Sequence, residues 1–162
     1  MNIKLNDLIS FLGKTSKDEL LIQYFSSINI DISDKLSLPD GEYRTYIDKP
    51  ELGISLAFTD EAMFLDKDNQ PIGFGLLYFS DIFLYSEGKD GYSQFKGILP
   101  ADISFNSVYD ELFSSFGAPS WSRKRVDGSL AAVRWDSLDK FRLHITFSKE
   151  TKLPTVINIS SK

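Results

Sequence analysis

Apolar residues recur with a helical period in two segments near the start of the chain. Residues 6–12 form the first segment, with Asn6 as its expected cap and Gly13 as its stop. In the second, Ser16 and Glu19 have the spacing of a capping box, which predicts a helix that begins there. Its expected buried stripe follows at intervals of three and four residues: Leu20, Leu21, Tyr24, Phe25 and Ile28.

The period changes to two in the next part of the chain, which indicates strands. Residues 42–48 form a candidate strand, and residues 54–58 alternate as a half-buried strand does. Residues 62–65 are expected to add a short strand before a turn at 66–70. Residues 76–85 would be apolar on both faces of a strand, so we expect a central strand there.

A second helix followed by strands is expected after Pro100. Ser107 is its predicted cap and Gly117 its stop, and the expected buried stripe is Val108, Leu112, Phe113 and Phe116. A basic turn and three strands are then expected: residues 123–128 for the turn, and residues 130–136, 141–147 and 155–160 for the strands.

This order of elements predicts one α+β domain over residues 1–162. Short turns between successive strands imply an antiparallel sheet, with helices packed on one face and the other face partly open. Each half runs from helix to three strands, so residues 16–85 and 100–160 are interpreted as tandem repeats. The match of Asp18-Glu19-Leu20 to Asp110-Glu111-Leu112 supports this interpretation.

The amino-acid composition excludes several kinds of covalent and metal chemistry. The 162 residues include no cysteine and one histidine, which excludes disulfides, thiolate chemistry and metal centres with several histidines. No apolar run approaches the roughly 20 residues of a membrane span, and the first residues lack an apolar signal core. We therefore expect a cytoplasmic protein without metal, cofactor or membrane contact.

The sole imidazole, His144, is expected to point away from the core between two inward-facing neighbours. A catalytic role would need an orienting carboxylate, for which Asp136 is the nearest candidate in sequence. No phosphate-binding loop, nucleophile elbow or metalloprotease motif is present. The chain is therefore predicted not to be an enzyme, with a small hydrolase using His144 as the less favoured alternative. Trp135 is expected in the core and Trp121 on a rim.

Charge is unevenly distributed over the chain, whose net charge is −5. Residues 1–75 hold 13 acidic and 7 basic side chains, whereas residues 76–162 hold 10 and 11. An acidic surface repels nucleic acid and attracts a basic partner, although it also serves solubility alone. The candidate partner-binding residues combine acidic and aromatic side chains: Asp40, Glu42, Tyr43, Tyr46, Asp48, Glu51, Asp60, Glu61, Tyr92 and Trp121.

Several motifs in the second half also carry a family resemblance. They are Gly97-Ile98-Leu99-Pro100, Ile103-Ser104-Phe105, Phe116-Gly117-Ala118-Pro119, Arg134-Trp135-Asp136 and the alternating segment 141–147. With them, residues 42–160 resemble small bacterial immunity proteins of polymorphic and contact-dependent toxin systems. The order of helix, Phe-Gly-x-Pro and strands also resembles one repeat of the β-lactamase-inhibitor-protein-like fold.

The resemblance implies a binder that neutralises a cognate, basic toxin domain by steric and electrostatic occlusion. Such a protein is expected to be monomeric before it binds. The secreted inhibitors of the second family carry a signal peptide and disulfides, neither of which is seen here, so lactamase inhibition is not expected. A non-catalytic adaptor or homo-oligomeric assembly protein is the alternative.

Overall fold

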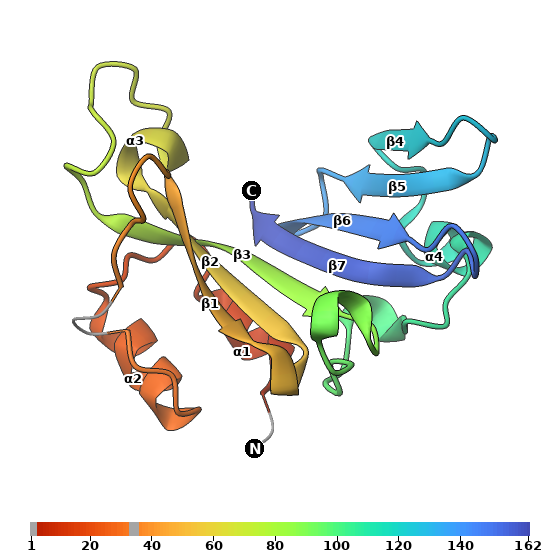
Figure 1. The fold of residues 1–162 in the computed structure, drawn as a ribbon, viewed down its shortest axis with the longest axis horizontal. Coiled ribbons are helices and arrows are strands. Elements are labelled where there is room, and N and C mark those ends of the chain that lie inside the picture. The colour runs from red at the N-terminus through yellow and green to blue at the C-terminus, as the bar shows by residue number, and fades with distance from the viewer. Residues whose placement is uncertain (1–2, 33–35) are drawn as a thin grey trace.

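The computed structural model describes residues 3–32 and 36–162, which build one seven-stranded sheet with only antiparallel pairs (Figure 1). Its α-helices there are α1 (Leu5–Ser10), α2 (Glu19–Ser27), α3 (Glu61–Phe64) and α4 (Tyr109–Phe116). Its strands there are β1 (Arg44–Lys49), β2 (Ile54–Asp60), β3 (Leu77–Tyr85), β4 (Trp121–Lys124), β5 (Leu130–Trp135), β6 (Phe141–Phe147) and β7 (Pro154–Ser161). The predicted α+β fold is confirmed.

The strand order is β1-β2-β3-β7-β6-β5-β4, so the two halves of the chain meet at the β3–β7 pair. Strands β1, β2 and β3 occupy places that correspond to β5, β6 and β7 across this pair. The second half has a fourth strand, β4, at the outer edge, so the predicted count of three strands was wrong there. Residues 123–124 of the expected basic turn belong to β4. Whether the halves are sequence repeats stays a prediction.

Helices α1, α2 and α4 cover one face of the sheet (Figure 1). The core beneath them uses alternate residues of the strands, such as Leu143, Ile145 and Phe147 of β6. Leu8, Leu21, Phe25 and Leu112 supply the fully buried helix side chains against it. Helices on one face are therefore observed as expected, with the exception of α3, which stands at one end of the opposite face.

All three predicted helix starts were wrong by one or two residues. The first helix, α1, has Lys4 and not Asn6 at its N-cap position. The α2 helix begins after Asp18, whose carboxylate accepts a hydrogen bond from the Leu21 N–H at 3.0 Å. Leu20 consequently points outward and is 67% exposed. In α4 the first turn follows Val108, because the Ser107 hydroxyl is engaged by the Ser104 N–H instead.

The segment 62–65, expected as a strand, lies in and just after the α3 helix. Asp60 ends β2 and caps α3 by accepting from the Ala62 N–H at 3.0 Å, which turns the chain out of the sheet. The preceding strand also differs from expectation, because all seven residues of β2 are buried instead of every second one. Its outward side chains Ser55 and Thr59 are small, and each is in hydrogen-bond contact with a longer side chain of β1, Asp48 and Arg44 respectively.

Strand β3 is central, as predicted, and contains a bulge that explains its unusual apolar pattern. Ala57 pairs with Asp81 and Phe58 pairs with Phe79, so Ser80 is an extra residue opposite β2. Because of this extra residue, successive core-facing side chains of β3 are Phe79 and Ile82, three residues apart instead of two. Both Ser80 and Asp81 consequently lie on the face away from α1, α2 and α4.

Candidate functional site: the open sheet face

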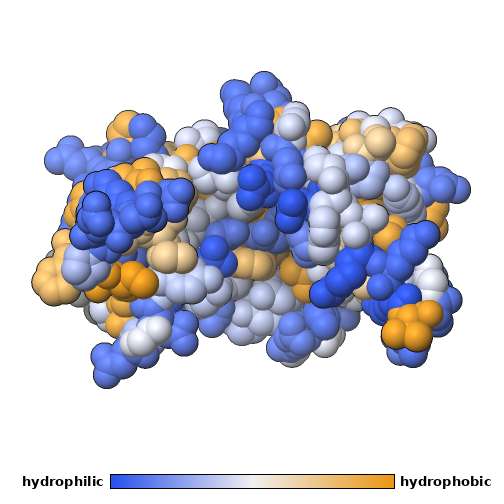
Figure 2. All heavy atoms as spheres, turned by 90° about the horizontal axis from the view of Figure 1, so that it is seen from above, coloured by the Kyte–Doolittle hydropathy of each residue, from blue (hydrophilic) through white to orange (hydrophobic). Residues whose placement is uncertain are grey.

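The sheet face away from α1, α2 and α4, here called the open face, is hollowed between α3 and β4 (Figure 2). The hollow has a volume of ≈ 630 Å³ and is lined by residues from α3 and six strands, including Arg44, Asp81, Arg142, His144 and Asn158. Strand register gives the order of side chains across this face. One row crosses all seven strands: Asp48, Ser55, Phe83, Asn158, His144, Arg134 and Trp121.

The middle of the open face is a connected polar network. The Arg44 guanidinium lies 3.5 Å from the Asp81 carboxylate and donates to the Thr59 hydroxyl at 3.1 Å. Asn158 donates to the other Asp81 oxygen at 3.2 Å. In the described residues no buried side-chain nitrogen or oxygen lacks a hydrogen-bond partner. The network therefore links four strands, β1, β2, β3 and β7, beneath the hollow.

The end of the open face nearest β4 carries an arginine cluster, which comprises Arg123, Arg134 and Arg142. Arg134 donates to both oxygens of Asp136, at 2.6 and 3.3 Å, and Arg142 Nε lies 3.1 Å from the same carboxylate. The hydrogen bond from Arg134 lowers the pKa of Asp136; burial opposes this shift, and the charges of Arg134 and Arg142 add to it. One carboxylate thus serves two guanidinium groups.

His144 lies in this cluster and does not pair with Asp136. Its ring stacks on Trp121 with 5.8 Å between centroids, and Arg134 lies 5.3 Å from the centre of the Trp121 ring. Within the described chain no hydrogen bond joins His144 to Asp136, whose oxygens are held by Arg134 and Arg142. The orienting pair that the hydrolase alternative requires is therefore not formed.

The pKa of His144 is lowered from its ordinary value of 6.5, first by burial and then by the charges of Arg134 and Arg123. The unfolded chain therefore takes up this proton at a higher pH than the folded protein does. Stability from neutral His144 is complete above the unfolded pKa and is lost as pH falls through the folded one. Because His144 is the only histidine, its ring-proton NMR signal should titrate with a midpoint below 6.5. A midpoint at or above that value would contradict the described contacts.

The opposite end of the open face carries a tyrosine patch, which comprises Tyr46, Phe83, Tyr85 and Tyr92 with Asp48 beside them. The rings of Tyr85 and Tyr92 stack with centroids 3.8 Å apart, and the Tyr46 and Phe83 centroids lie 6.2 Å apart. Burial and then the nearby Asp48 carboxylate raise the pKa of Tyr92, so its phenol stays protonated. Asp48 also accepts from the Ser55 hydroxyl at 2.6 Å. The patch offers aromatic rings and neutral hydroxyls next to an acidic group.

The structure brings together only some of the predicted partner-binding residues. Tyr46, Asp48 and Tyr92 meet in the tyrosine patch, and Trp121 lies 37% exposed in the arginine cluster, on a rim as predicted. Trp135 is in the core, also as predicted, and its Nε1 donates to the Gly117 carbonyl at 3.0 Å. The remaining residues lie outside both groups: Asp40, Glu42, Tyr43, Glu51, Asp60 and Glu61.

Asp60 is the clearest correction among these residues. It is 0% exposed, and its oxygens accept from the Ala62 and Gly73 N–H groups, so it anchors α3 and a loop instead of facing a partner. Glu61 accepts from Lys67 at 3.0 Å and from Gln70 at 2.9 Å. These hydrogen bonds lower its pKa and commit its side chain to the same loop.

Sequence reasoning missed an apolar rim beside α3. The rim consists of exposed side chains of α3 and the loop that follows: Met63, Leu65, Ile72, Phe74 and Leu76. Phe74 is 83% exposed, the largest exposed fraction among the aromatic side chains of the described residues. Figure 2 shows apolar surface at this end of the hollow. The signal was the run Ile72-Gly73-Phe74-Gly75-Leu76, in which apolar residues alternate with glycines in a segment too irregular for a strand.

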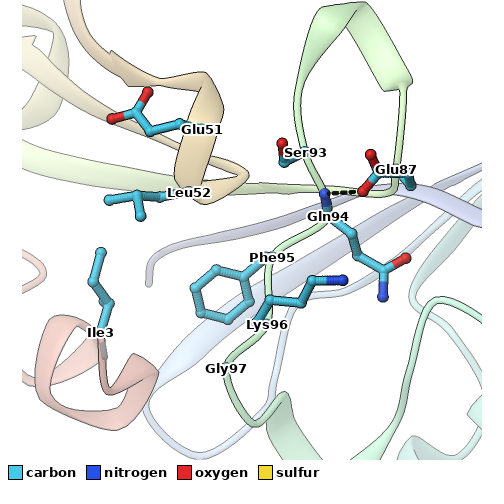
Figure 3. Close-up of a pocket in the computed structure, with 9 residues that line it drawn as sticks. All are labelled: Ile3, Glu51, Leu52, Glu87, Ser93, Gln94, Phe95, Lys96 and Gly97. Atoms are coloured by element: carbon cyan, nitrogen blue, oxygen red, sulfur yellow. Dashed lines mark hydrogen bonds between the residues drawn. The ribbon is translucent and has the colours of Figure 1, made fainter. Parts of the chain in front are cut away.

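A second hollow of ≈ 330 Å³ lies at the end of the sheet where β1 turns into β2 (Figure 3). Phe95 forms its floor with Ile3 and Leu52, and Glu87 accepts from the Gln94 N–H at 2.8 Å (Figure 3). Glu51 and Lys96 stand at its mouth (Figure 3). The polar atoms here hold the 93–97 loop in place, so we interpret this hollow as structural.

Comparison of the chain with protein-family models, with curated proteins and with solved structures found no match. No set of three or more histidine, cysteine, aspartate or glutamate side chains in residues 3–32 and 36–162 has the arrangement to hold a metal ion. No helix in that part of the chain has the length and apolarity to cross a membrane. The open face is therefore interpreted from its own geometry.

Proposed function

We propose that the protein is a binding protein of the immunity type, which neutralises a toxin domain by occupying its working surface. The observation that carries this proposal is the open face itself: a hollowed sheet surface with aromatic and charged side chains at both ends and an apolar rim. Such surfaces, with aromatic anchors among polar groups, are typical of protein–protein contacts. The resemblance of residues 42–160 to immunity proteins supports the same role.

The tyrosine patch and the apolar rim are the proposed anchors. Tyr46 is 49% exposed and Phe74 is 83% exposed, so each has apolar area left to bury against a partner. Asp48 and Asp90 lie close enough to raise the pKa of Tyr85, after the larger effect of burial. This negative field favours encounter with a basic toxin surface.

The test is growth rescue by the protein of cells that express the product of the neighbouring reading frame. Full rescue and a 1:1 complex by size-exclusion mass are expected for the unchanged protein. Tyr46→Ala and Phe74→Ala should each weaken the complex by about tenfold or more, because each removes an aromatic anchor. Ile98→Ala is the matched control, because Ile98 is 79% exposed but lies away from the open face.

Two results would contradict the proposal. One is rescue without complex formation, which would point to indirect protection. The other is an equal loss for Tyr46→Ala, Phe74→Ala and Ile98→Ala, which would show that exposed apolar area matters wherever it lies. A stable homo-oligomer that does not dissociate with the toxin would favour the assembly-protein alternative.

A further inference from the structure

The arginine cluster carries more positive charge than its surroundings neutralise. Asp136 is the carboxylate that contacts Arg134 and Arg142, and Arg123 forms no ion pair within the described residues. Two positive charges therefore remain at this end of the open face, in a chain whose net charge is −5. After the larger effect of burial, the charges of Arg134 and Arg123 also lower the pKa of His144, as expected where the local potential is positive.

The free donors of this cluster point to a specific kind of group. Asp136 occupies Nε and Nη2 of Arg134 and lies nearest Nε of Arg142, while Nη1 and Nη2 of Arg142 form no hydrogen bond in the described chain. The Arg142 side chain is 45% exposed. Paired guanidinium N–H groups match the two oxygens of a carboxylate. Trp121, stacked with His144, provides a flat apolar surface beside them.

We propose that the arginine cluster binds a carboxylate-bearing segment of the partner's polypeptide, with Arg142 and Arg123 as the principal donors and Trp121 packing against the segment's apolar atoms. This inference rests on the proposed function and adds to it the chemical nature of the partner segment that contacts the arginine cluster. The adjoining hollow of ≈ 630 Å³ is large enough for a few side chains. Nucleic acid is disfavoured as the occupant because the chain as a whole carries a net charge of −5.

Opposite charges at the two ends of the open face would fix the partner's orientation. A basic surface of the partner would contact the tyrosine patch with Asp48, and an acidic segment of the partner would contact the arginine cluster. The reversed orientation of the partner would bring like charges together at both ends. Like-charge contacts oppose wrong orientations more strongly than matching contacts add affinity. The open face would therefore accept a partner in one direction.

The test measures binding of a fluorescent glutamate-rich peptide to the full chain by anisotropy at low ionic strength. We expect saturable binding that Arg142→Gln and Arg123→Gln each weaken by about tenfold, since each removes charge-assisted hydrogen bonds. Lys149→Gln is the matched control: it removes the same charge from the exposed turn that follows β6, and it should change the affinity by less than about twofold. A single-stranded oligonucleotide of equal charge serves as the competing probe.

Three results would overturn the inference: no peptide binding by the unchanged protein, an equal loss for Arg142→Gln and Lys149→Gln, or tighter binding of the oligonucleotide than of the peptide. None of these measurements needs the toxin. Failure of growth rescue would therefore count against the proposed function alone, while failure of peptide binding would count against the arginine site alone.

Discussion

Replacing Gly53 with alanine is expected to lower the free energy of unfolding by about 2–4 kcal/mol, the larger part from overpacking. Gly53 has φ +70° at the start of β2, and a Cβ atom there would lie 2.4 Å from the Phe95 nitrogen and from the Ser93 carbonyl oxygen. Both are backbone atoms, which cannot rotate away as a side chain can. The 93–95 segment must therefore move, and the stacked Tyr92 beside it would move as well. Urea unfolding followed by circular dichroism measures the loss.

Gly128→Ala separates the two causes of this loss. Gly128 has φ +85° in the β4–β5 hairpin, but a Cβ atom there would meet nothing within 4 Å. Only backbone strain should then be felt, which amounts to about 1 kcal/mol. Equal losses for the two variants would show that the 93–95 loop does not pack closely over Gly53.

Asp60→Ala is expected to cost about 2–4 kcal/mol, because it leaves the buried Ala62 N–H and the part-buried Gly73 N–H without their acceptor. The α3 helix has only four residues and depends on this cap, so the apolar rim should lose its order together with the helix. Thermal unfolding gives the stability change, and amide hydrogen exchange at residues 61–76 reports the local effect.

Asp60→Asn and Asp68→Ala are the controls for this prediction. The asparagine keeps one side-chain oxygen as acceptor and should recover part of the loss, and Asp68 is an exposed loop residue whose removal should cost less than about 0.5 kcal/mol. Because Asp60→Ala disorders the apolar rim, it should also weaken toxin binding. Unchanged exchange at residues 61–76 would contradict the anchoring role.

The sequence predicted the fold well where the pattern was strictly periodic. The β6 alternation of Leu143, Ile145 and Phe147 was found as expected, because a period of two residues places alternate side chains on the same face of a strand. It failed where one side chain overrode the pattern. Asp60 caps α3 where a strand was expected, and the bulge at Ser80 changes which residues of β3 face the core. Neither effect can be recognised from the hydrophobic periodicity of the sequence.

The candidate site was harder to predict than the fold because sheet register assembles it. Tyr46 is far from Phe83 and Tyr85 along the chain and becomes their neighbour only through the β1–β2–β3 pairing. The arginine cluster likewise depends on the β4–β5–β6 register, and in the sequence Arg123 suggested only a basic turn. Acidic composition pointed to the first half of the chain but could not tell which of its residues face outward, as the buried Asp60 shows.

The position of β7 has a consequence for how the molecule is made. Although β7 is the last strand along the chain, it lies between β3 and β6, at the junction of the two halves (Figure 1). Until residues 154–161 have left the ribosome, β3 presents an unpaired edge whose backbone can pair with any other exposed strand. Nascent chains stalled before Pro154 should thus aggregate or recruit chaperones, whereas release of that single segment closes both halves at once.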